Sequence, residues 1–170
     1  MAGLQEHRLD VVIAGLPPAH ADIEAEPFAR HPHCIVAAPS HVLVGRKGLS
    51  WAELRDEPFL YREAGSATRN FLEHLLQAHQ LQVHVSTELH GNEAIKQAVM
   101  ADMGISFMSA NAFQVELETD RIAVLDVVEM PKMLDWCVLQ KRDTTLTGIN
   151  ALFKTFVLTH GAEYAARRLA

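Results

Sequence analysis

Short apolar runs alternate with helical patterns along most of this chain, and that alternation restricts the possible folds more than any other feature. Runs of strand length, most of them rich in β-branched residues, occupy 9–16, 34–38, 58–61, 83–87, 105–109, 122–127 and 136–142. Apolar residues at helical spacing follow from about 67, over 93–103, near 112–118 and from about 147. This order predicts an α/β fold with mostly parallel sheets.

Single residues refine this expectation at several points. The continuous run 9–16 predicts a strand buried on both faces, and Pro27 predicts irregular or edge structure after it. Asn92 is expected to cap the helix that follows it, and helical spacing predicts that Ile95, Ala98, Val99 and Met103 face the core. Gly104 should then end that helix in a left-handed conformation.

Size and charge narrow the class of protein. The 170 residues suffice for one domain of ordinary size or for two small lobes. With 49% hydrophobic and 21% charged residues, the chain is neither disordered nor fibrous. Its formal net charge of −6 argues against a nucleic-acid-binding face, since such faces carry a basic excess.

The cysteines and the apolar content indicate the compartment. Cys34 and Cys137 lie alone in apolar runs, which favours buried free thiols in a reducing compartment; a single disulfide is the alternative. The sequence shows neither a signal peptide nor 18 consecutive apolar residues. We therefore predict a cytoplasmic location and no membrane partner.

The loop YREAGSATR opens directly into an amphipathic helix and carries a surplus of polar groups. Gly65 permits close backbone approach, Ser66 and Thr68 supply hydroxyls, and Arg69 supplies a guanidinium group. Together with the free amides of a helix start, these groups predict a cradle for an anion. The alternative is that Ser66 simply caps the helix and the other groups are solvated.

Two further segments are weaker candidates for ligand contacts. Asn92 and Glu93 begin a second helix, where a cap and a favourable interaction with the helix dipole explain them equally well. Gly15, Leu16 and Pro17 follow a predicted strand, at the end where open α/β sheets bind ligands. A turn that merely ends the strand is the alternative there.

Patterns typical of metal sites and enzymes are missing from the sequence. His31, His33 and Cys34 form a compact group, but their spacing matches no zinc pattern and no second group completes it. No nucleophile elbow, phosphate-binding loop, dinucleotide fingerprint or C-x-x-C motif occurs. We therefore predict no metal, no cofactor and no enzymatic activity.

Five blocks, taken in order, resemble the effector-binding domain of LysR-type transcriptional regulators. The blocks are LDVVIAGLPP, PFARHPHCIVAAPSHVLVGR, EPFLYREAGSATRNFLE, HGNEAIKQAVMADMGISFMS and RIAVLDV. The wording REAGSATR and GNEAIKQAV is most similar to the subgroup that controls Calvin-cycle carbon-fixation operons. The resemblance covers nearly the whole chain.

The resemblance implies a particular architecture. Two Rossmann-like α/β subdomains, similar to a type 2 periplasmic binding protein, would be joined by two crossing strands. Subdomain I would hold 1–38 and 128–170, and subdomain II would hold 39–127. The first strand, helix and strand of subdomain I would be missing, as would a DNA-binding winged helix-turn-helix domain, so that the chain is expected to be N-terminally truncated.

The resemblance also implies a function. A small anionic metabolite, such as a phosphorylated sugar or NADPH, would bind in the cleft between the subdomains. Ser66, Thr68 and Arg69 would then hold the anion, and the segment Gly15, Leu16 and Pro17 would form the opposite wall. Binding would change dimer or tetramer geometry, and DNA contact would be made only through the absent domain. A solute-binding protein of transport, or a truncated fragment with only an interaction role, is the alternative.

Overall fold

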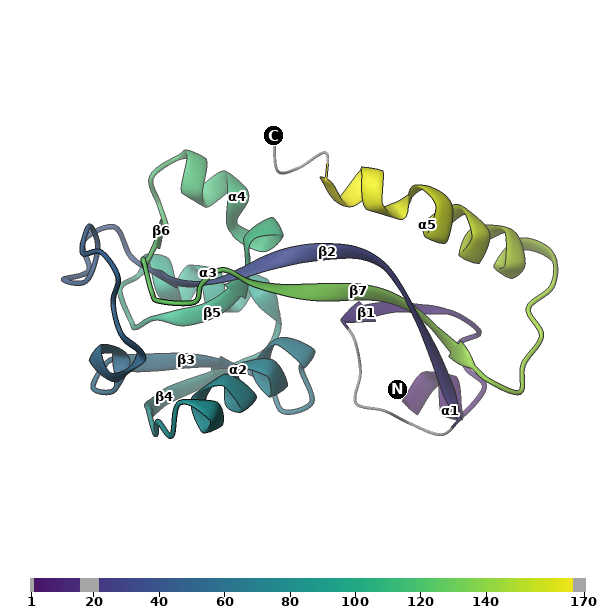
Figure 1. The fold of residues 1–170 in the computed structure, drawn as a ribbon, viewed down its shortest axis with the longest axis horizontal. Helices are drawn as coiled ribbons and strands as arrows, with labels where there is room; N and C mark the ends of the chain where they lie inside the picture. Colours follow the sequence, from purple (N-terminus) through teal and green to yellow (C-terminus); the bar gives the residue numbers. More distant parts are fainter. Residues whose placement is uncertain (1, 16–21, 167–170) are drawn as a thin grey trace. The chain divides into compact units, whose positions relative to one another are not determined.

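The computed structural model describes residues 2–15 and 22–166. The chain divides into two compact units, which we call unit 1 (residues 1–31 and 133–170) and unit 2 (residues 32–132). Strands β2 (Ile23–Ala37) and β7 (Lys132–Lys141) contribute to both units (Figure 1). The subdomain boundaries expected from the sequence, 1–38 with 128–170 and 39–127, stay a prediction.

Unit 1 is built on antiparallel pairing between β1 (Val12–Gly15) and β7. The short helix α1 (Ala2–Gln5) precedes β1, and the long helix α5 (Gly148–Ala166) follows β7. A small core lies among α1, β1, β7 and the start of β2; it contains Leu4, Ile23, Cys137 and Leu139. Unit 1 therefore has its own apolar centre.

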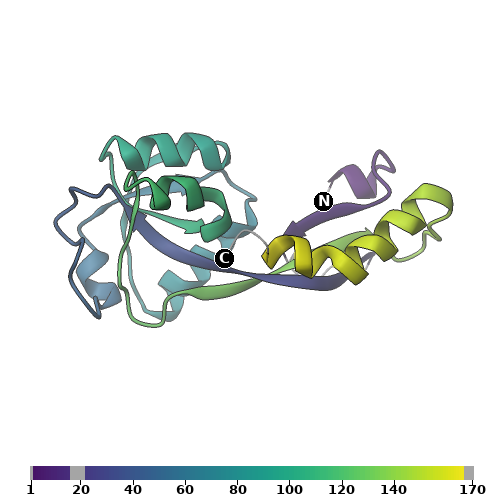
Figure 2. The same ribbon diagram turned by 90° about the horizontal axis from the view of Figure 1, so that it is seen from above.

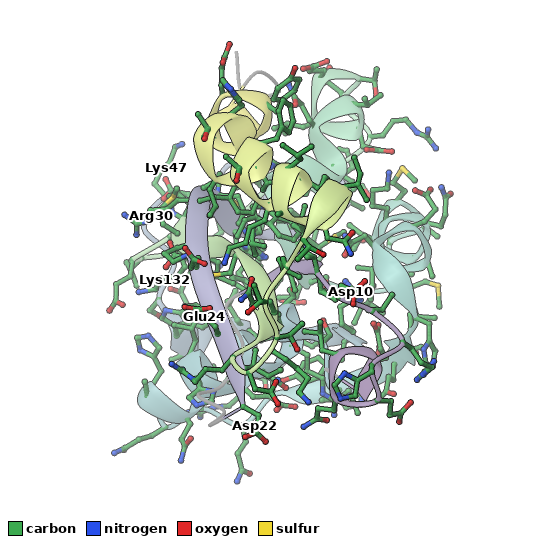
Figure 3. All side chains as sticks on the ribbon, turned by 90° about the vertical axis from the view of Figure 1, so that its right-hand side faces the viewer. Asp10, Asp22, Glu24, Arg30, Lys47 and Lys132 are labelled. Carbon is green, nitrogen blue, oxygen red and sulfur yellow. The ribbon has the colours of Figure 1, made fainter. Side chains whose placement is uncertain are left out.

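Helix α5 packs along the strands of unit 1 (Figures 1 and 2). Lys154 forms an ion pair with Glu26 of β2 and donates to the Oε1 atom of Gln140 of β7 at 2.8 Å. Asn150 at the helix start donates to Asp10 at 2.8 Å; Figure 3 labels Asp10 beside β1. Polar contacts thus attach the helix to both strands and to the segment before β1.

Unit 2 contains the remaining elements. In chain order they are a 3₁₀ helix Trp51–Leu54, β3 (Pro58–Arg62), α2 (Ala67–Ala78), β4 (His84–Leu89), α3 (Gly91–Met100), β5 (Ser106–Ser109), α4 (Ala110–Glu118) and β6 (Ala123–Val124). Strands β3 and β4 pair in parallel, whereas β5 and β6 both pair antiparallel with β2. Helices α3 and α4 pack against each other and against these strands.

Helix α3 is held in unit 2 by the apolar residues that it buries in the core. The inward residues predicted from helical spacing are confirmed: Ile95, Ala98 and Val99 are buried. They join a cluster whose other members come from β2, β3, β5, α4 and the segment before β6: Val36, Leu60, Met108, Phe113 and Ile122. Fully burying each of these side chains contributes about 1.5–3 kcal/mol.

The prediction of mostly parallel sheets is wrong. The pairs β1–β7, β2–β5 and β2–β6 are all antiparallel, whereas β3 and β4 pair in parallel. An alternation of strands and helices does not fix strand direction, because a helical connection can return the chain in either sense. The α/β class is nevertheless correct, with helices and strands in a mixed arrangement.

One expectation for the first strands is also wrong, and another is wrong in part. Strand β1 has only four residues and leaves Ile13 42% exposed, so it is not buried on both faces. The segment around Pro27 is not irregular, since it lies inside the 15-residue strand β2; the edge position expected there as the alternative stays a prediction. Proline lacks only the N–H donor, and a strand position whose donor faces no partner strand tolerates it.

The ends of α3 differ from the prediction as well. His90, not Asn92, occupies the N-cap position, and Met103 is 52% exposed. The left-handed conformation after the helix belongs to Asp102, with φ +57°. Gly104 has φ +150° and a different role: the missing side chain lets its backbone lie against Pro58 of β3.

The described residues include both cysteines and all the helices discussed above. Cys34 and Cys137 are both free, Cys137 buried and Cys34 partly buried. Burial raises the pKa of the Cys34 thiol to about 11. Within residues 2–15 and 22–166, no helix is long and apolar enough to cross a membrane.

Candidate functional site

The predicted loop and helix start form as expected. Helix α2 begins at Ala67, and Ser66 occupies the N-cap position with an extended backbone. Gly65 has φ +86°, a conformation that favours glycine, while a Cβ atom there would meet nothing within 4 Å. Gly65 is therefore required for the shape of the turn, and the space beside it is open.

In the described part of the chain, several hydrogen-bonding groups at the start of α2 have no protein partner. The Ser66 side chain makes no capping hydrogen bond, and no acidic residue lies in the first turn. Across the described residues, the N–H groups of Ala67, Thr68 and Arg69 have no acceptor. A helix N-terminus in this condition carries roughly half a positive charge and favours an anion.

The start of α3 is different, because a carboxylate already occupies it. Glu63 accepts a hydrogen bond from the N–H of Gly91 at 3.1 Å and from two nitrogens of Arg62 at 2.7 Å each. Arg62 also donates to Asn92 at 2.5 Å. Glu93 lies in the first turn of α3 and pairs with Lys96 at 2.9 Å. The loop before α2 is thereby tied to α3.

Glu63 should make stability depend on pH. Hydrogen bonds from Arg62, and next from Gly91, lower the pKa of Glu63 from 4.5 to about 2. Between these two pH values the unfolded state binds a proton that the folded state does not, so falling pH favours unfolding. We expect the free energy of unfolding of the wild type to fall toward that of Glu63→Gln between pH 4.5 and 2.

Urea denaturation of both proteins at several pH values measures this effect. Glu63→Gln keeps an acceptor for Gly91 but cannot titrate. A difference between wild type and variant that stays constant from pH 6 to pH 2 would contradict the assigned role of the carboxylate.

Arg69, in the first turn of α2, is already engaged by other groups of the protein. Its Nε atom donates to Glu73 at 2.8 Å, and its Nη1 atom donates to Glu88 of β4 at 2.5 Å. Nη1 also donates to the backbone carbonyl of Arg62 at 3.2 Å, and the guanidinium lies 5.5 Å from the ring centre of Tyr61. These contacts attach α2 to β4. The anion-binding role predicted for Arg69 stays a prediction.

A buried histidine contacts the start of α2. His33 of β2 is only 1% exposed, and its Nε2 atom lies 3.4 Å from the Oγ1 atom of Thr68. The imidazole stacks on Phe107 of β5, with ring centres 5.0 Å apart. Phe107 in turn stacks on Phe71 of α2, at 6.1 Å. The strand pair β2–β5 thus places an imidazole directly beside one of the predicted site hydroxyls.

The remaining predicted site residues lie elsewhere. Gly15 ends β1 in unit 1 and pairs with Trp136. Leu16 and Pro17 lie outside the described residues. Within unit 2 the structure gathers Gly65, Ser66 and Thr68 at one helix start and leaves Arg69 turned toward β4.

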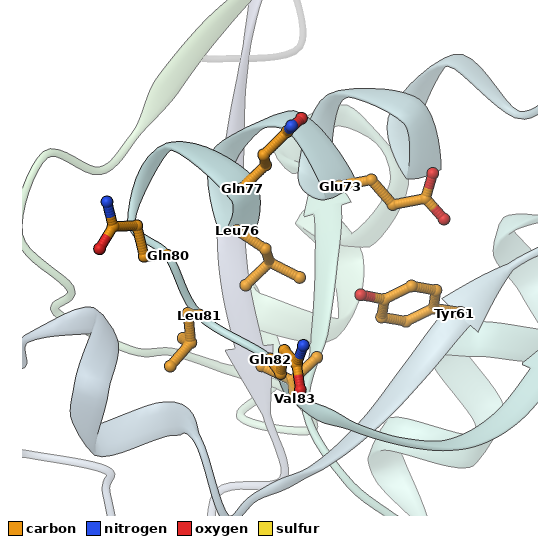
Figure 4. A pocket seen from close by; sticks show the side chains of 8 residues that line it. All are labelled: Tyr61, Glu73, Leu76, Gln77, Gln80, Leu81, Gln82 and Val83. Carbon is orange, nitrogen blue, oxygen red and sulfur yellow. The ribbon is translucent and has the colours of Figure 1, made fainter.

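A groove of about 600 Å³ lies on another part of unit 2 (Figure 4). It is formed by the second half of α2, by β3 and by the segment before β4, and is lined by Tyr61, Glu73, Leu76, Gln77, Gln80, Leu81, Gln82 and Val83. This lining contains a carboxylate and no basic side chain. The groove is therefore less suited to an anion than the start of α2.

The described residues contain no group of three or more His, Cys, Asp or Glu side chains that could hold a metal ion. His31 and His33 are instead packed against aromatic rings, His31 on Trp136 at 4.6 Å. Burial lowers the pKa of His31 to about 4, partly offset by the charge of Asp135.

Sequence comparison decides the family. The sequence model of the LysR substrate binding domain matches residues 1–162. The chain belongs to the LysR substrate-binding domain family. It is similar to the HTH-type transcriptional regulator CfxR of Cupriavidus necator, at 40% identity over 164 residues, which are 96% of this chain and 52% of CfxR. It is also 37% identical over 166 residues to CbbR of Rhizobium meliloti, covering 96% of this chain and 53% of CbbR.

Solved LysR structures agree with the fold. The regulatory domain of CcmR from Synechocystis PCC6803, solved in complex with 2-PG, superposes with a TM-score of 0.86 and 32% identity. That match covers 93% of this chain and 76% of CcmR's. The effector-binding domain of QuiR superposes with a TM-score of 0.84 at 20% identity, which supports the fold alone.

The named relatives favour a transcriptional regulator over a solute-binding protein of transport. This chain spans about half the length of the curated relatives it matches. Those relatives are transcriptional regulators, so a solute-binding protein of transport is not supported. Their names describe regulators and not enzymes.

The contacts of His33 and Glu63 in this LysR domain are not predicted by the sequence. The spacing around His33 suggests only a metal ligand, although its place two residues after His31 on a strand puts both on one face. Glu63 precedes the predicted site by two residues. Nothing in the sequence shows that it reaches Gly91, 28 residues away.

Proposed function

We propose that this chain is the effector-sensing part of a LysR-type transcriptional regulator and that it binds a small anionic metabolite at the start of α2. The observation that carries the proposal is the set of groups left open there: the Ser66 hydroxyl and the first-turn amides, with no acid in that turn. The Thr68 hydroxyl lies beside them and contacts the His33 imidazole. The CcmR domain in complex with 2-PG, at 32% identity, makes 2-PG the first compound to test.

The anion would be held chiefly by the helix terminus. Ser66 and Thr68 can each donate one hydrogen bond, and Gly65 leaves the approach open. Glu63 lies nearby, but Arg62 neutralises its charge. Gly15, Leu16, Pro17, Asn92 and Glu93 stay predictions as further ligand contacts, and Arg69 acts in this proposal mainly by anchoring α2 to β4.

Binding would regulate by population shift. A ligand that prefers one arrangement of the protein raises the population of that arrangement by its difference in affinity. In the proposal the shifted property is the geometry of a dimer or tetramer, and DNA contact is made by a helix-turn-helix part outside these 170 residues. The cytoplasmic location predicted from the sequence belongs to this proposal.

Calorimetric titration of the chain with 2-PG tests the proposal, with phosphorylated sugars and NADPH as parallel ligands. We expect 2-PG to bind and Thr68→Val to weaken its affinity about tenfold, the effect of losing one hydrogen bond to a charged group. Thr155→Val is the matched control, because Thr155 is exposed on α5 in unit 1. No binding by the wild type, or equal binding by Thr68→Val, would overturn the site.

A further inference from the structure

We propose that His33 is a positioning residue for this anion site: its imidazole orients the Thr68 hydroxyl so that the hydroxyl proton points at the ligand. The proposal rests on the proposed function of the α2 start. It is carried by the contact between His33 Nε2 and Thr68 Oγ1, 3.4 Å apart, and by the near-complete burial of the imidazole.

Packing holds the imidazole in place. His33 is paired with Ser109 in the β2–β5 ladder, and its ring lies on Phe107 at an interplanar angle of 29°. Phe107 is 2% exposed and also stacks on Phe71 of α2. The imidazole is therefore fixed against the same helix whose first turn carries Thr68. Such a side chain can set the direction of a neighbouring hydroxyl without touching the ligand.

Hydrogen-bond chemistry sets the polarity of this contact. A hydroxyl has one proton to donate and lone pairs that accept, whereas a fully ionised carboxylate or phosphate group offers only acceptors. If Thr68 donates to the anion, it cannot donate to His33 as well. The hydroxyl oxygen must then accept from Nε2–H, so the ligand-bound protein holds the His33 tautomer with its proton on Nε2.

Without ligand the same contact has two possible polarities. Thr68 can donate to an unprotonated Nε2, or it can accept from Nε2–H, because the neutral imidazole carries a proton on either nitrogen. Only the second arrangement leaves the hydroxyl proton available to an anion. His33 therefore contributes to affinity to the extent that it donates to Thr68 before the ligand arrives.

A double-mutant cycle on 2-PG affinity tests this coupling. His33→Phe keeps a ring to stack on Phe107 but removes Nε2, and Thr68→Val removes the hydroxyl. We expect His33→Phe to weaken 2-PG binding about fivefold, and to weaken it little further in the Thr68→Val background. His33→Gln, which retains an N–H donor, should recover part of the loss.

The outcomes separate the two proposals. If the wild type does not bind 2-PG or the other anions, both proposals fall. If the wild type binds and Thr68→Val weakens binding, but His33→Phe binds as the wild type does or the two losses multiply, only the role of His33 is overturned. Unfolding midpoints of the variants show whether each one is folded at the titration temperature.

A spectroscopic measurement does not depend on the folding of His33→Phe. Long-range ¹H–¹⁵N correlation spectra report the tautomer of each histidine, and His33→Gln identifies the His33 signals by their loss. Saturation with 2-PG should give the Nε2–H tautomer of His33. A bound state with the proton on Nδ1 alone would overturn the proposal, because Nε2 could then only accept.

Discussion

Replacing Gly104 with alanine will lower the free energy of unfolding by about 3 kcal/mol. A Cβ atom at this position would lie 2.2 Å from the carbonyl oxygen of Pro58 and 3.0 Å from its carbonyl carbon. The same oxygen accepts a hydrogen bond from Ile105 at 2.8 Å, and Leu60 donates to the Ile105 carbonyl at 2.9 Å. The new methyl group therefore forces β3 and the start of β5 apart.

Gly45→Ala is the matched control for this substitution. Gly45 also has positive φ, +82°, but a Cβ atom there would meet nothing within 4 Å. Gly45→Ala should lower the free energy of unfolding by only about 1 kcal/mol, which is the cost of holding a non-glycine residue at positive φ. Urea denaturation of both variants measures the difference, and equal losses would show that the contact with Pro58 is unimportant.

Phe107→Ala is expected to have the largest effect of the substitutions considered, about 3–5 kcal/mol. Phe107 is 2% exposed and contacts rings on two other elements, His33 of β2 and Phe71 of α2. Truncation leaves a cavity that these strands and the helix cannot close without moving. Because His33 loses its stacking partner, 2-PG affinity should fall along with stability.

Phe153→Ala gives the corresponding control. Phe153 lies on α5 and is 45% exposed, so its removal should cost under about 1 kcal/mol. Thermal or urea unfolding of the two alanine variants measures the contrast. A similar loss for both would mean that Phe107 contributes no more than a surface phenylalanine.

Local patterns predicted several elements correctly. Helix α2 starts at Ala67, where the polar loop meets the apolar stripe, and α5 starts at Gly148, one residue from the expected start. Ile95, Ala98 and Val99 of α3 also face the core as predicted, although Met103 does not. Each of these depends on residues within about two helical turns of one another, so the information lies in the sequence itself.

Other features depend on distant residues and were not predictable in the same way. The direction of β2 against β5 follows from their packing, and the lack of room for a side chain at Gly104 follows from Pro58, 46 positions earlier. The predicted anion site likewise combines features that depend on neighbouring residues with features that depend on distant ones. Gly65, Ser66 and Thr68 meet because they are neighbours in the chain, whereas Arg69 could have turned to a ligand or to a carboxylate.

A polar helix start with spare donors can be predicted for this LysR domain from residues 61–69 alone, because turn and capping preferences act over a few residues. Which charged groups surround that helix start depends on how the strands and helices pack. Packing brings Glu88 to Arg69, so that this cation is paired, and brings Glu63 to Gly91, so that the start of α3 already holds a carboxylate. It also places His33 beside Thr68. Ion pairs form between groups that lie close in space, and residues distant in the sequence come close only when the strands and helices pack.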